Sequence, residues 1–177
     1  MTKPEIITAA ENAFNRFAKT CNSIDVVDFF KRPGEKWSVA ENVQHLIIST
    51  NTSSLAWYLP LFLVKWIGGT PNRNSRTYDE LNNKYYTQLS EGGRASGRFV
   101  PKPVDIKYGK QKLLNNWNKA TTKFIKTLHK NRREEDLDNY LVKHPLLGRI
   151  TLRELGYFSI FHTEHHLQSI QKPVETP

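Results

Sequence analysis

Apolar side chains recur every three or four residues along four long segments of this 177-residue chain, which is the period of an α-helix with one buried face. The alternation of apolar and polar residues that β-strands need is absent over any useful length. The sequence therefore predicts an all-α protein. The four long segments are residues 3–21, a segment that begins at residue 38, residues 106–130, and a segment from residue 151 to just before Pro173.

Local signals mark where two of these helices begin. Ser38 is followed three residues later by Glu41, and Thr151 is followed in the same way by Glu154. Both pairs have the spacing of a capping box, in which a hydroxyl and a carboxylate satisfy the first free amides of a helix. Pro60 should kink or end the helix that Ser38 begins, because proline has no amide hydrogen and clashes with the preceding turn.

Shorter elements are predicted between the long helices. The sequence predicts short helices over residues 78–90 and 134–142, and turns at Pro33-Gly34 and at residues 144–148. Residues 91–103 are rich in glycine and proline and are not expected to form regular structure. A long connection of this kind often serves as a lid or pocket rim, and it can equally be a plain crossover.

Length and cysteine content favour a single intracellular domain over residues 1–177. Cys21 is the one cysteine, so no intramolecular disulfide can form and a reducing cytoplasm is the expected location. The N-terminus lacks the apolar segment of a signal peptide. The most apolar run, residues 55–67, is interrupted by Pro60 and Lys65 and is too short to span a bilayer, so no membrane association is expected.

The formal net charge of +9 raises the question of nucleic-acid binding. The lysines and arginines are scattered along the chain, and Arg132-Arg133 is followed at once by three acidic residues. The chain has no zinc-finger cysteine spacing and no aromatic RNA-binding motif. A solvated basic surface explains this distribution better, and a nucleic-acid-binding module is kept only as an alternative.

The last helical segment holds three of the six histidines within five positions. At about 100° per residue, His162 and His166 share one face with the apolar residues of the segment, and His165 lies on the flank of that face. Two imidazoles four residues apart can chelate one metal ion. The alternatives are a surface pair and a buried, hydrogen-bonded pair. Ser159 on the same face is small enough to leave room for an ion and a ligand.

His45 lies on the core-facing side of the helix that Ser38 begins, together with Glu41. A lone histidine in such a place is more often a hydrogen-bonded core residue than a metal ligand. Its interest comes from a possible meeting with His162 and His166 across the helices. Capping alone explains Glu41, and a role near the metal or in proton transfer is the alternative.

Four stretches of the chain form a pattern known from one family. Two of them carry the histidines, Trp-Ser-Val-Ala-Glu-Asn-Val-Gln-His-Leu at residues 37–46 and Phe-His-Thr-Glu-His-His-Leu-Gln-Ser-Ile at residues 161–170. The others are the lead-in at residues 144–154 and the tyrosine-rich helix with the segment after it, residues 85–101. Over residues 5–171 the chain resembles the DinB-like, or damage-inducible, superfamily.

The resemblance implies a four-helix bundle with a long crossover connection and one or two short extra helices. It also implies a three-histidine metal site at His45, His162 and His166, open to water. His165 is then a second-shell residue or proton shuttle, a surface residue, or a substitute ligand. Zinc and nickel are the expected metals, since all three ligands are nitrogens.

Members of the superfamily differ in their chemistry. The expected function is a metal-dependent hydrolase or a small-molecule transferase that uses a low-molecular-weight thiol, and a homodimer is implied. The main alternative is a non-catalytic helical binding protein whose histidines hydrogen-bond one another without metal.

Overall fold

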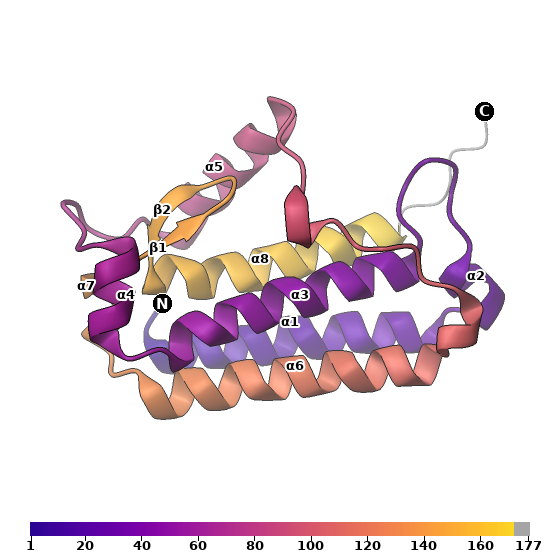
Figure 1. Ribbon diagram of the computed structural model, residues 1–177, viewed down its shortest axis with the longest axis horizontal. Coiled ribbons are helices and arrows are strands. Elements are labelled where there is room, and N and C mark those ends of the chain that lie inside the picture. Colours follow the sequence, from indigo (N-terminus) through magenta and orange to yellow (C-terminus); the bar gives the residue numbers. More distant parts are fainter. Residues whose placement is uncertain (172–177) are drawn as a thin grey trace.

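Four long helices lie side by side in the computed structural model, which describes residues 1–171 (Figure 1). The chain is mostly helical, as predicted, and all four long helices are present. Their bounds are α1 (Lys3–Ser23), α3 (Val39–Tyr58), α6 (Lys110–Asn131) and α8 (Leu152–Gln171). The predicted end of the last helix before Pro173 lies at the limit of the described residues, because Pro173 itself is outside them.

Capping boxes begin four of the helices. In each box the hydroxyl accepts a hydrogen bond from the amide three residues on, and the carboxylate there accepts one from the amide of the capping residue. Both boxes predicted from the sequence are formed. The four pairs are Thr2–Glu5, Ser38–Glu41, Thr77–Glu80 and Thr151–Glu154.

Aromatic side chains fill the core between α1 and α6. The rings of Phe14 and Trp117 meet edge to face with 5.4 Å between centroids, and Phe14 meets Phe124 in the same way at 5.5 Å. Cys21, at the end of the same face of α1, is fully buried, as expected of a small apolar residue, and burial raises the pKa of its thiol to about 12. This side of the molecule is therefore packed with apolar groups.

The opposite side of α3 and α8 is covered by the connections (Figure 1). Helix α5 (Tyr78–Ser90) is present as predicted and packs on α8. The segment after it, residues 91–103, is the crossover. It is irregular apart from one short 3-10 turn, η1 (Gly97–Phe99), which contacts α3. The crossover thus runs over the two helices that carry the histidines.

Helix α3 ends at Tyr58, and Pro60 precedes a new helix, α4 (Leu61–Gly68), as the sequence predicts. The chain bends by 116° at this break. Among the described residues, no single helix combines the length and hydrophobicity needed to cross a bilayer, and α3 and α4 meet that test only when counted together across the bend.

The short helix predicted over residues 134–142 is present over only four of these residues, and two short strands were not predicted. Helix α7 (Asp136–Asn139) is a single turn, followed by the antiparallel hairpin β1 (Leu141–His144) and β2 (Gly148–Thr151). Tertiary contacts explain the difference, because the amide of Leu141 donates to the carbonyl of Gly69 at the end of α4. Strands of four residues are also too short for alternation to be recognised.

Three further expectations need correction. Helix α2 (Val26–Phe30), capped by the side chain of Asp25, was not predicted. The third long helix begins at Lys110 rather than residue 106, after the 3-10 turn η2 (Ile106–Tyr108). Four shorter helices, α2, α4, α5 and α7, accompany the long ones in the described chain, where the resemblance implied one or two.

Gly68 fixes the contact between α4 and the hairpin. A Cβ atom at this position would lie 1.6 Å from the carbonyl oxygen of Leu141, a backbone atom that cannot rotate away. We expect Gly68→Ala to cost about 3 kcal/mol or more of folding free energy. The melting temperature should fall by roughly 10 °C, measured by circular dichroism.

The matched control is Lys65→Ala, which changes an exposed position in the same helix and should leave the melting temperature nearly unchanged. Equal melting temperatures for both variants and the parent chain would contradict the close contact.

Candidate metal centre

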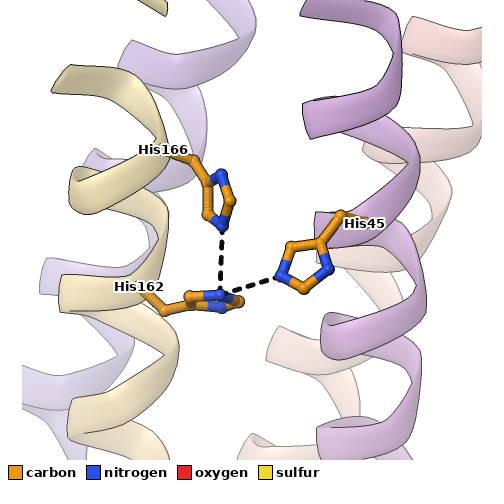
Figure 2. A group of neighbouring side chains, drawn as sticks. All are labelled: His45, His162 and His166. Carbon is orange, nitrogen blue, oxygen red and sulfur yellow. Dashed lines mark hydrogen bonds between the residues drawn. The ribbon is translucent and has the colours of Figure 1, made fainter. Parts of the chain in front are cut away.

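Three imidazoles converge in the space between α3 and α8 (Figure 2). His45 extends from α3, and His162 and His166 extend from consecutive turns of α8. The Nε2 atom of His162 lies 3.0 Å from that of His45 and 3.2 Å from that of His166. All three side chains are buried. The structure thus brings together the three residues that the sequence nominated as metal ligands.

The outer nitrogen of His45 is held by the crossover. Its Nδ1 atom lies 2.6 Å from the backbone carbonyl oxygen of Phe99. A carbonyl oxygen only accepts hydrogen bonds, so Nδ1 carries the hydrogen and the lone pair of the neutral ring is on Nε2. That lone pair faces the other two histidines.

An amide holds His166 in the same way. The Nδ1 atom of His166 lies 2.6 Å from Oδ1 of Asn42. The amide nitrogen of Asn42 donates to the carbonyls of Trp37 and Ser38, which fixes the oxygen toward the histidine. His166 therefore also presents a bare Nε2. The Nδ1 atom of His162 is 3.4 Å from the hydroxyl oxygen of Ser49.

This donor set fits a divalent metal ion. His45 and His166 each direct a lone pair at His162, which can supply only one Nε2 hydrogen to the two of them. A cation can accept all three lone pairs at once. Tetrahedral zinc with bonds of 2.0–2.1 Å holds its ligand nitrogens about 3.3 Å apart. The two distances from Nε2 of His162 are close to this value, and all three ligand atoms lie within 4.8 Å of one another.

The protonation of the cluster also suits a metal. Burial, reinforced by the neighbouring imidazoles, holds the pKa of His162 and of His166 well below the ordinary value. Burial lowers the pKa of His45 as well, although its bond to the Phe99 carbonyl acts in the opposite direction. The three rings are therefore neutral at pH 7, which is the form that binds a metal.

A cavity of about 960 Å³ opens onto the cluster. Trp37 stacks parallel to His166, with 6.3 Å between ring centroids, and Phe158 stacks on His162 at 4.5 Å. The crossover, from Gly93 to Val100, and the hairpin form further walls. The irregular segment at residues 91–103 thus supplies part of the cavity rim and, through Phe99, positions His45.

The structure places the remaining candidates beside the cluster. His165 lies outside the group of three, lines the cavity, and packs edge-on against the rings of Tyr85 and Tyr86. Glu41 accepts hydrogen bonds from the amide of Ser38 and the guanidinium of Arg32, and it is not among the described residues that line the cavity. Capping and ion pairing thus account for Glu41, and proton transfer by either residue stays a prediction.

Some residues that hold the cluster were not recognised from the sequence. Asn42 lies three positions before His45 and therefore shares its helix face, and this spacing was an available signal. The carbonyl of Phe99 left no signal, because every residue has one and only the path of the crossover brings it near. Ser159, expected to leave room for a ligand, donates to the carbonyl of Leu155 within α8 and is not among the described residues that line the cavity.

The fold and the site define a mostly helical protein with a three-histidine cluster able to hold a metal. A family model described as the DinB superfamily matches residues 9–170, so the chain belongs to the DinB superfamily. Comparisons with curated proteins and with solved structures gave no match. The family resemblance seen in the sequence is thereby confirmed.

Asn42 should tune the metal affinity of the cluster without being a ligand. In Asn42→Ala, the Nδ1 hydrogen of His166 loses its acceptor and the ring loses its fixed orientation. We expect the affinity for Zn²⁺ to fall about tenfold to a hundredfold, measured by competition with a chromophoric chelator.

The control for this variant is Asn51→Ala, at an exposed position of the same helix, with an affinity expected to equal that of the parent chain. If Asn42→Ala also bound Zn²⁺ like the parent chain, the assigned role of the amide would be wrong.

Proposed function

We propose that this protein is a metal-dependent enzyme of the DinB superfamily that acts on a small molecule. His45, His162 and His166 are the proposed ligands, and the four long helices form the bundle of that family. The observation that carries the proposal is the convergence of three imidazole Nε2 atoms in the lining of a cavity of about 960 Å³. A cavity of this size suits a small molecule rather than a macromolecule.

Zinc and nickel are the proposed metals, since three imidazole ligands suit both ions. Neutral imidazoles leave the ion its full charge, so when bound it supplies a site that lowers the pKa of a water molecule or holds a thiolate. Trp37 and Phe158 line the cavity, where they stack on His166 and His162.

The proposed reaction is hydrolysis or the transfer of a group to or from a low-molecular-weight thiol. Both reactions use the same feature of the site, an open coordination position beside an apolar wall. Within the described chain, no carboxylate forms a hydrogen bond to the three histidines. This favours a thiolate as the nucleophile, because a thiolate attacks without a general base. Thiol-dependent transfer is therefore the first activity to screen.

A non-catalytic binding protein is the second candidate. The imidazoles already contact one another at hydrogen-bond distances, so the cluster can persist without a metal. A nucleic-acid-binding module is a more distant candidate, which would show a binding affinity that falls steeply with salt.

Metal analysis separates the first two candidates. We expect the purified protein to contain about one equivalent of a transition metal by elemental analysis. The double variant His162→Ala, His166→Ala should contain almost none, because it removes two of three ligands. Chelation should lower the melting temperature of the parent chain and leave that of the double variant unchanged.

The matched control is His129→Ala, which removes an exposed histidine at the end of α6 and should keep the metal. Absence of metal in the parent chain, with no uptake of added Zn²⁺ or Ni²⁺, would overturn the enzyme proposal in favour of the binding protein.

We also propose that the protein is a cytoplasmic homodimer. Exposed apolar side chains at the end of α3 and along α4 support the dimer, since a surface of this kind is typical of protein contacts. Trp66, the most exposed of them, has 83% of its surface accessible. The others are Leu55, Tyr58, Phe62 and Ile67.

Trp66→Glu should separate the dimer into monomers, because it places a charge in an apolar contact. Light scattering after size exclusion would report the mass of each species. Lys119→Glu, at an exposed position of α6, is the control and should remain dimeric. A parent chain that is monomeric at high concentration would exclude the dimer.

A further inference from the structure

His144, at the end of β1, lines the same cavity and has no role in the cluster. Its Nδ1 atom accepts two backbone hydrogen bonds, from the amides of Leu146 at 3.2 Å and Leu147 at 3.1 Å. An atom that accepts from two amides carries no hydrogen of its own. The hydrogen of the neutral ring is therefore on Nε2, and the turn that closes the hairpin fixes this tautomer.

The ring lies one aromatic side chain away from the cluster. Phe158 contacts both rings. His144 meets it edge to face with 4.2 Å between centroids, and His162 stacks on it at 4.5 Å. A molecule that lies along Phe158 can thus reach the three histidines at one end and His144 at the other. Burial lowers the pKa of His144 to about 4, so the ring stays a neutral donor near pH 7.

The charges around the cavity indicate which kind of ligand could accept the Nε2 hydrogen of His144. Among the described residues that line the cavity, Glu35 is the one carboxylate. Four cationic side chains also line it, and none of them forms an ion pair within residues 1–171. They are Lys36, Arg94, Arg98 and Lys143. A positive rim over an apolar wall favours a small organic anion.

We propose that His144 donates its Nε2 hydrogen to the carboxylate of a small organic acid, whose other end meets the three-histidine centre. The inference rests on the proposed metal function and adds a substrate class and a binding residue to it. The rival explanation is that His144 only stabilises the turn through its Nδ1 atom. Both explanations use the same ring, but they depend on different nitrogen atoms.

Two variants separate the nitrogen atoms. In His144→Asn, the short side chain can still accept from the amides of the turn, as asparagine does in such turns, but it does not reach the place of Nε2. In His144→Gln, the amide nitrogen reaches about as far as Nε2 and no acceptor remains near Nδ1. The first variant should keep the fold and lose the donor, and the second should weaken the turn and keep the donor.

The probes are 3-mercaptopropionate and its neutral analogue 3-mercaptopropionamide, bound to the protein loaded with Co²⁺. The thiolate-to-cobalt absorption band reports binding of either compound, independently of any enzymatic activity. We expect the parent chain to bind the carboxylate about tenfold more tightly than the amide, as a charge-assisted hydrogen bond provides. His144→Asn should reduce this preference several-fold, to what the four cationic side chains alone provide, and His144→Gln should retain most of it.

The outcomes distinguish this inference from the proposed function. Co²⁺ binding with equal affinities for both thiols, or with an unchanged preference in His144→Asn, would overturn the role of His144 and leave the metal centre intact. Failure to bind Co²⁺ would overturn the metal function. In that case the role of His144 is tested by nitrogen NMR of the metal-free protein, with and without propionate. If propionate does not shift the His144 Nε2 signal, the inference is overturned as well.

Discussion

The arrangement of the site depends on two hydrogen bonds that face away from it. His45 donates to the carbonyl of Phe99 and His166 donates to the amide of Asn42, each at 2.6 Å. These bonds leave both lone pairs on the inner nitrogens, so the cluster can receive a cation. The Phe99 carbonyl belongs to the crossover and Asn42 belongs to α3. The site therefore forms only when both elements are correctly placed relative to α8.

A buried polar cluster costs free energy, and the rest of the chain compensates for it. Apolar rings pack between α1 and α6. The site lies between α3 and α8, and its cavity is lined by the connections that cover these two helices on the opposite side (Figure 1). The N-terminus of α8 is anchored by Glu154, which has no exposed surface. Burial alone would raise the pKa of this carboxyl, but bonds from Arg73 and from backbone amides lower it overall.

Sequence patterns predicted the parts of the molecule that depend on local physics. The long helices, their capping boxes and the break at Pro60 follow from the helical period and from backbone chemistry, and all are present. The hairpin was missed because Leu141 has no strand signal of its own and is extended through its bond to Gly69. His144 was assigned only to a turn, although it lines the cavity.

The sequence by itself determined which residues can form the site. The spacing of His162 and His166 places both on one face of a helix, and the helical pattern around His45 turns that residue toward the core. Only the tertiary structure decided that the three Nε2 atoms meet, that Phe99 and Asn42 select the tautomers, and that His144 faces the same cavity. These features join residues more than fifty positions apart, and no local period encodes the distance between them.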